Sequence, residues 1–220
     1  MALTCGIDEA GRGPVIGPMI LAAVVVDEEG VCKLRELKVR DSKKISPKRR
    51  SYLEPLVKEI ALEYKTIRIS ASEIDMMRKK MSLNLAEALK TAELIIGLNE
   101  KPERVIVDAT DNIAEDYTKR ILDCMNKTDP SYKPPHIHSE HKADDKYAEV
   151  SAASIIAKVA RDREIELLRE KHGDFGSGYP SDELTQKFLR RIIGDGELPS
   201  FVRRSWSTVD KSRQSMLGDF

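Results

Sequence analysis

The sequence predicts an α/β fold in which a mixed β-sheet is flanked by helices. Three strand-like segments, residues 4–8, 19–27 and 64–70, come early, and GRGPVIGP between the first two breaks both helix and strand. Further along, segments with helical periodicity alternate with short apolar segments. This alternation is typical of a sheet that carries helices on its faces.

The first half of the chain should contain two well-marked helices and a basic loop. Ser46 is suited to cap a helix that continues from Pro47 to about residue 59. A capping box from Ser72 to Asp75 predicts another helix start. Residues 84–98 place apolar side chains at helical spacing, and residues 37–44 are expected to form a loop.

In the second half, the apolar run RVIVD at 104–108 predicts a buried strand that ends in an acid. A helix is expected next, then a short strand, then a long helix and a last helix capped by Ser181. Their expected ranges are 113–125, 134–139, 146–171 and 182–193. We expect irregular or weakly helical structure from residue 197 onward.

Composition excludes several classes of protein. Of the 220 residues, 40% are hydrophobic and 34% are charged, which fits neither a disordered chain nor a membrane protein. Cys5, Cys32 and Cys124 form no CxxC pair, so we expect a reduced, cytoplasmic protein. No signal peptide is visible, and the longest apolar run, residues 19–26, is shorter than the roughly 20 residues of a membrane helix.

Two local basic patches stand against a net charge of zero. Residues 33–50 carry nine Lys and Arg against Glu36 and Asp41, and residues 201–214 carry four against Asp210. Such patches fit phosphate contacts, and they fit solvated surface equally well.

Acidic residues follow the predicted strands. Asp8 and Glu9 close the first strand, and Asp108 closes RVIVD. Asp144 and Asp145 precede the long helix. Each has an ordinary alternative, because a lone Asp often caps a loop or a helix. Together they predict a site, since ligands of α/β sheets gather outside strand ends.

Grouped carboxylates repel one another unless a cation neutralises them. Oxygen ligands suit magnesium or manganese, and two such ions about 4 Å apart hydrolyse phosphodiesters. Because neighbouring strand residues point to opposite faces, Asp8 and Glu9 share a site only if the strand bends. The glycines at positions 11 and 13 favour such a bend.

Other chemistries find less support. The glycine spacing of GRGPVIG does not match a dinucleotide-binding fingerprint, and neither a phosphate-binding GxxxxGK[ST] loop nor a GxSxG elbow occurs. His136, His138 and His141 lack the cysteine partners or second pair expected of a zinc site.

Six motifs in order, GIDEAGRGPVIGP, RDSKK, VDATD, EHKADDKY, SAASIIAKVARDRE and GSGYPSD, resemble ribonuclease HII from Gly6 to about Trp206. The resemblance implies a ribonuclease H-like fold and cleavage of RNA in RNA–DNA hybrids, including single ribonucleotides in duplex DNA. We expect a catalytic domain at 1–178, a helical C-terminal extension at 179–213 and a tail at 214–220.

The resemblance also implies roles for individual residues. Asp8, Glu9, Asp108 and Asp144 are the expected catalytic acids that bind Mn²⁺ or Mg²⁺, and Asp144 is preferred to Asp145 because it directly follows HKA. The residues expected to recognise the ribonucleotide are Gly11, Arg12, Gly13 and Tyr179. Glycine lets the backbone amides come close to the ribonucleotide. A tyrosine ring packed against a deoxyribose leaves no room for a 2′-hydroxyl at that position. Without the resemblance, Tyr179 would be taken for a turn tyrosine.

Basic residues in these motifs are expected to contact phosphates. They are Lys43 and Lys44 of RDSKK, and Lys158 and Arg161, which lie three apart on the long helix and share a face. Ordinary surface charge is the alternative. The apolar residues at 152–157 are expected to be helix core.

The last residues, QSMLGDF, place Gln214, Leu217 and Phe220 at the spacing of a peptide that binds the sliding clamp, proliferating cell nuclear antigen. This points to an archaeal type of enzyme. We expect a monomer whose main partners are RNA–DNA hybrid and ribonucleotide-containing duplex DNA. The rival hypotheses are a hybrid-binding module without turnover, which would not need all four acids, and another nuclease or recombinase with the same fold.

Overall fold

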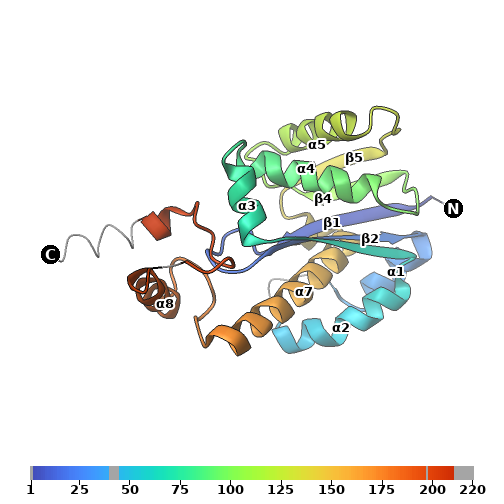
Figure 1. Ribbon diagram of the computed structural model, residues 1–220. Helices are drawn as coiled ribbons and strands as arrows, with labels where there is room; N and C mark the ends of the chain where they lie inside the picture. Colours follow the sequence, from blue (N-terminus) through green and yellow to red (C-terminus); the bar gives the residue numbers. More distant parts are fainter. Residues whose placement is uncertain (1, 40–44, 197, 211–220) are drawn as a thin grey trace. The chain divides into compact units, whose positions relative to one another are not determined.

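The computed structural model describes residues 2–39, 45–196 and 198–210 (Figure 1). The chain divides into two compact units. The first comprises residues 1–10, 20–67 and 84–160, and the second comprises 11–19, 68–83 and 161–220. The domain boundaries expected from the sequence, after residues 178 and 213, stay a prediction.

A five-stranded sheet has the order β3-β2-β1-β4-β5. β1 pairs antiparallel with β2 and parallel with β4, and β4 pairs parallel with β5. The strands span Thr4–Ala10 (β1), Met19–Val26 (β2), Glu63–Ile69 (β3), Arg104–Asp108 (β4) and His136–Glu140 (β5). The predicted mixed sheet is therefore confirmed.

Helices cover both faces of this sheet (Figure 1). On one face, alternate β2 residues from Ile20 to Val26 pack with Leu34, Leu53 and the first half of α7 in one buried apolar cluster. That layer contains α1 (Glu28–Glu36), α2 (Pro47–Ile60) and α7 (Ala148–His172). The other face carries α4 (Leu83–Ile96) and α5 (Ala114–Thr128).

A glycine sets how closely α7 approaches the sheet. A Cβ atom on Gly6 of β1 would overlap the backbone of Glu149 and Val150. The first turns of α7 therefore lie directly on β1, which is how helix side chains come within reach of the strand's acidic end.

Two helices begin at capping residues other than those expected from the sequence. Asp27 is not the end of β2 but the cap of α1, a helix that the sequence analysis missed, and its side chain accepts a hydrogen bond from the Gly30 amide. The capping box lies at Ser70–Glu73 instead of Ser72–Asp75, because β3 ends at Ile69 and Ser70 is the first residue free to cap α3 (Ala71–Arg78).

Two further boundaries are corrected. The long helix is interrupted at Tyr147, whose extended backbone separates α6 (Ala143–Lys146) from α7. The cap of α8 (Glu183–Gly194) is Asp182, not Ser181, because the Asp182 carboxylate accepts from the amides of the first helical turn.

The second unit has its own apolar core. Val15, Ile16, Phe175, Phe188 and Val202 are among the buried residues of one cluster. An isolated bridge joins Ile16 to Val202, which ties the 11–19 segment to the C-terminal segment. Among the described residues, no helix is both long and apolar enough to cross a membrane.

Candidate active site

Two acids lie side by side on neighbouring parallel strands. β1 and β4 pair up to Ile7 and Val107, so Asp8 and Asp108 follow the last register pair, Asp108 as the final residue of β4 and Asp8 two residues before the end of β1. Residues in parallel register point to the same face, and Ile106 packs with Val150 of α7 on that face. The two carboxylates therefore point toward the α7 layer.

Asp8 is buried, with 5% of its surface exposed. Burial raises its pKa well above the usual range, and the charges of Glu9 and Asp108 raise it further. A hydrogen bond with Ser154 and the charge of Lys158 act in the opposite direction. The Lys158 ammonium also donates to Ser154 Oγ at 2.8 Å. Two α7 residues one helical turn apart thus face the strand acids.

Ser154 is a site residue that sequence analysis missed. It lies inside the apolar stretch expected to be helix core, and it is fully buried there. A hydroxyl in a run of alanines and isoleucines is a visible signal, because a buried polar side chain needs a partner.

The backbone of α6 contacts Asp108. The Ala143 amide donates to Asp108 Oδ1 at 2.8 Å. Asp144 follows at once and is fully buried, whereas Asp145 is half-buried. Asp144 is not the cap of a helix, since Lys142 holds that position with a left-handed backbone. The structure thus brings Asp144 into the turn that contacts the β4 end.

Glu9 points away from the face that holds Asp8. β1 stays regularly paired through Ala10, so the expected bend at Asp8 and Glu9 is absent. Strand alternation then directs Glu9 to the α4–α5 layer, where its charge is among the causes that raise the pKa of the buried Tyr117 hydroxyl. Glu9 and Asp8 still influence each other electrostatically at the strand end.

A third acid, Glu140, ends β5 in register with Asp108. It accepts hydrogen bonds from Lys146, from the Tyr147 hydroxyl at 2.8 Å and from His138 at 3.2 Å. These donors, Lys146 first, lower its pKa to about 2. The negative charge of Glu140 is therefore offset by its donors to a greater extent than that of Asp8. In the sequence, only its place before His141 in EHKADDKY pointed to Glu140 as a site residue.

The donor set suits a divalent cation in chemical terms. Asp8, Glu9, Asp108 and Asp144 offer oxygen ligands alone, and the raised pKa of Asp8 records negative charge that a cation would neutralise. Among the described residues, no three His, Cys, Asp or Glu side chains already converge as a ligand set.

In the second unit, a buried arginine holds the glycine segment. Arg203 is fully buried and donates to the carbonyls of Gly11 at 2.5 Å, Arg12 at 2.8 Å and Gly17 at 3.0 Å. Trp206 Nε1 donates to the Gly13 carbonyl at 3.0 Å. Sequence analysis placed Arg203 only in a basic patch, but its guanidinium is structural.

Tyr179 and Arg161 pack against the same segment. Gly11 has φ +88°, and a Cβ there would overlap the Arg161 side chain, whereas a Cβ on Gly13 would lie 3.3 Å from the Tyr179 ring. Arg161 Cζ lies 6.0 Å from the centre of that ring. The structure thus assembles the residues expected to recognise a ribonucleotide.

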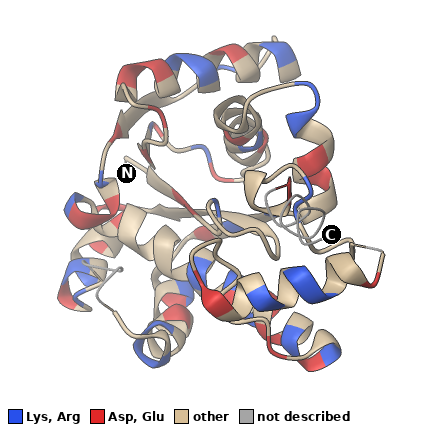
Figure 2. Cartoon of the chain, turned by 90° about the vertical axis from the view of Figure 1, so that its left-hand side faces the viewer, with Lys and Arg blue, Asp and Glu red and all other residues tan. Residues whose placement is uncertain are grey.

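The expected phosphate contacts have different environments. Lys158 is half-buried beside Ser154, and Arg161 is buried. Lys43 and Lys44 lie outside the described residues, as do Gln214, Leu217 and Phe220. Figure 2 shows Lys and Arg interspersed with Asp and Glu along the helices.

A mixed sheet of this strand order, with helices on both faces, has the ribonuclease H-like fold. The model of the ribonuclease HII family matches residues 5–209, so the chain belongs to that family. It is a type 2 ribonuclease H, an enzyme that cleaves the RNA strand of RNA–DNA hybrids.

Relatives match over nearly the whole chain. The ribonuclease HII of Methanothermobacter thermautotrophicus is 46% identical over 95% of this chain and 98% of its own. The crystal structure of ribonuclease H2 from Pyrococcus horikoshii OT3 has a TM-score of 0.89 and 40% identity, covering 98% and 99%. The ribonuclease HII in a complex with PCNA from Archaeoglobus fulgidus has a TM-score of 0.85 and 41% identity, covering 99% and 100%.

Proposed function

We propose that this ribonuclease HII also cuts on the 5′ side of single ribonucleotides embedded in duplex DNA, leaving 3′-hydroxyl and 5′-phosphate ends. The observation that carries the proposal is the juxtaposition of Asp8 and Asp108, which directly follow the last register pair of the adjacent parallel strands β1 and β4. Carboxylate oxygens are suitable ligands for the divalent cations that phosphodiester hydrolysis requires.

In this proposal Asp8, Glu9, Asp108 and Asp144 hold two ions, Mn²⁺ or Mg²⁺. Bound there, such ions activate water and stabilise the leaving oxygen. The protein's part is to position the ligands. The Ala143 amide orients Asp108, and Ser154 with Lys158 orients Asp8 and offsets part of its charge. Glu9 is included because the family resemblance implies it, and its charge acts on Asp8 from the opposite face of β1.

Ribonucleotide recognition falls to Gly11, Arg12, Gly13 and Tyr179. Arg203 and Trp206 occupy the carbonyls of this segment, which fixes its path. Tyr179 is 44% exposed beside Gly13, so its side chain is accessible to a sugar. A ring packed on a deoxyribose discriminates against a 2′-hydroxyl at that position, and the glycine segment contacts the ribonucleotide.

Phosphate contacts are assigned to Lys43, Lys44, Lys158 and Arg161. Arg161 supports this assignment best, because its Nε and Nη2 are buried without a hydrogen-bond partner within the described residues. Burial lowers the pKa of its guanidinium, as expected for a cation that lacks compensation. An anionic ligand would supply that compensation.

The test is cleavage of a labelled DNA duplex that carries one ribonucleotide, beside an RNA–DNA hybrid, with Mg²⁺, Mn²⁺ or chelator. We expect metal-dependent cutting 5′ of the lone ribonucleotide. Tyr179→Ala should reduce that cut more than cleavage of the hybrid, with Tyr64→Ala as an exposed-tyrosine control. Cutting of the hybrid alone would contradict the roles of Tyr179 and the glycine segment.

We also propose that the tail, residues 214–220, binds a sliding clamp through Gln214, Leu217 and Phe220. The support is their spacing and the complex of PCNA with the Archaeoglobus enzyme. Deleting residues 214–220 should abolish binding to an archaeal clamp in surface plasmon resonance and leave cleavage of free duplex unchanged. Unchanged clamp binding would refute this assignment. We expect the free enzyme to be a monomer.

A further inference from the structure

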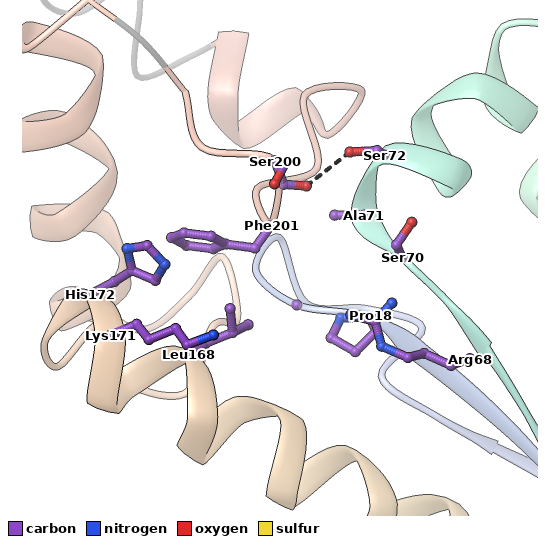
Figure 3. A pocket seen from close by; sticks show the side chains of 11 residues that line it. Pro18, Arg68, Ser70, Ala71, Ser72, Leu168, Lys171, His172, Ser200 and Phe201 are labelled. Atoms are coloured by element: carbon purple, nitrogen blue, oxygen red, sulfur yellow. Dashed lines mark hydrogen bonds between the residues drawn. The ribbon is translucent and has the colours of Figure 1, made fainter.

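A basic pocket lies within the second unit, apart from the residues assigned above (Figure 3). It has a volume of about 340 Å³. Two cationic side chains line it, Arg68 and Lys171, together with the His172 imidazole and the hydroxyls of Ser70, Ser72 and Ser200. They come from the end of β3, the first turn of α3, the end of α7 and the segment after α8.

Among the described residues, none that lines this pocket carries a carboxylate. Arg68 donates to Glu164 at 2.8 Å, but its side chain remains 52% exposed. Lys171 is exposed and forms neither an ion pair nor a hydrogen bond with any described residue. In a protein with equal numbers of acidic and basic residues, the unpaired charge of Lys171 beside Arg68 needs an explanation.

Helix chemistry accounts for only part of the cluster. Lys171 and His172 lie in the last turn of α7, where cations are favoured by the helix dipole. That reason does not apply to Arg68, which lies next to the end of β3, or to the hydroxyls of Ser72 and Ser200. Ser70 is the capping residue of α3, and its amide and hydroxyl donate to the Glu73 carboxylate.

An aromatic wall completes the pocket. The Phe201 ring packs on the His172 ring with centroids 4.4 Å apart and planes 39° apart. This contact holds His172 in place, and Ser72 Oγ donates to the Ser200 carbonyl at 3.1 Å across the lining (Figure 3). Cations and hydroxyls beside an aromatic surface suit a phosphate group and its sugar, whereas a metal cation would be repelled.

We infer that this pocket binds a backbone phosphate of the nucleic acid that the enzyme cuts, through residues other than the catalytic acids. The inference rests on the proposed function for its ligand, because a polyanionic duplex is the substrate. Exposed Lys171 and His172 are accessible to a strand on the protein surface. The same side chains would also recognise free inorganic phosphate, and the experiment below distinguishes that ligand from a nucleic-acid strand.

The experiment measures binding of a fluorescent duplex with one ribonucleotide by anisotropy, in chelator so that no strand is cut. Lys171→Ala is compared with Lys187→Ala, which removes an exposed lysine of α8 outside the pocket. We expect Lys171→Ala to weaken binding about fivefold at low salt and to reduce the slope of log K against log salt by about 0.9. Lys187→Ala should change neither.

Equal behaviour of the two variants, with a wild type that binds and cuts, would overturn the pocket inference alone. A wild type that neither binds nor cuts the duplex would overturn the proposed function and this inference with it. In a second arm, inorganic phosphate is titrated while the His172 ring is followed by NMR. Phosphate binding there, with duplex binding unaffected by Lys171→Ala, would reject the nucleic-acid ligand.

Discussion

The Asp108 carboxylate accepts a hydrogen bond from the Ala143 amide at 2.8 Å, which joins the end of β4 to the turn that carries Asp144. The two acids lie 36 positions apart in the sequence. One backbone contact thus sets how two of the four proposed metal ligands approach each other. Asp108 therefore has a structural role, as the acceptor for the Ala143 amide, in addition to its proposed chemical role as a metal ligand.

Substitutions at Asp108 should separate these roles. Asp108→Asn keeps an oxygen that accepts from Ala143, so thermal stability should stay close to wild type, whereas Asp108→Ala should lower the melting temperature. Both should lose cleavage by on the order of 10³-fold, because a metal ligand is lost. Melting curves and rates on the ribonucleotide duplex check this. Substantial activity of Asp108→Asn would contradict the proposed site.

Asp144 and Asp145 form a matched pair of adjacent acids. Asp144→Asn should reduce cleavage by on the order of 10³-fold, because the fully buried Asp144 is a proposed metal ligand. Asp145→Asn should stay within about threefold of wild type, as for a half-buried residue outside the ligand set. Rates measured across a Mn²⁺ titration test the assignment, and the reverse order would transfer the role to Asp145.

Asp182 should make stability depend on pH near the acid limit. The Ser177 hydroxyl and amide, and then the amides of α8, lower its pKa to about 2. An unfolded Asp titrates near 3.9, so this stabilisation is complete above about pH 4 and is lost as the pH falls toward 2.

Asp182→Asn should remove that part of the pH dependence. Melting temperatures of wild type and variant should differ at pH 5 and converge toward pH 2. Asp195→Asn, at the other end of α8, serves as the control. A constant difference between pH 5 and pH 2 would show that Asp182 does not titrate as the structure indicates.

Arg203 should be essential for the glycine segment. Arg203→Ala leaves the carbonyls of Gly11, Arg12 and Gly17 without their donor, which should cost about 3 kcal/mol or more of unfolding free energy. Arg204→Ala, at the exposed neighbour whose guanidinium donates to the Leu198 carbonyl, should cost about 1 kcal/mol. Urea unfolding measures both, and equal losses would refute the structural role of Arg203.

Local pattern in the sequence was enough to locate the strands and the acids near their ends. RVIVD was predicted as a buried strand with the bounds that β4 has, and Asp108 does end it, whereas β1 continues two residues beyond Asp8. Ser46 was predicted as a helix cap, and its side chain does accept from the Arg49 amide. These features depend on neighbouring residues, so periodicity and capping chemistry report them directly.

Tertiary structure decided the rest. The end of β3 determines that Ser70, and not Ser72, caps α3. The pairing of β1 with β2 determines which side of the sheet Glu9 faces. Ser154 facing Asp8, and Arg203 holding Gly11 across 192 positions, join segments far apart in the sequence. Hydrophobic pattern is a local property of the chain, whereas strand register and buried hydrogen bonds are chosen by the packing of distant segments, and only the folded chain shows them.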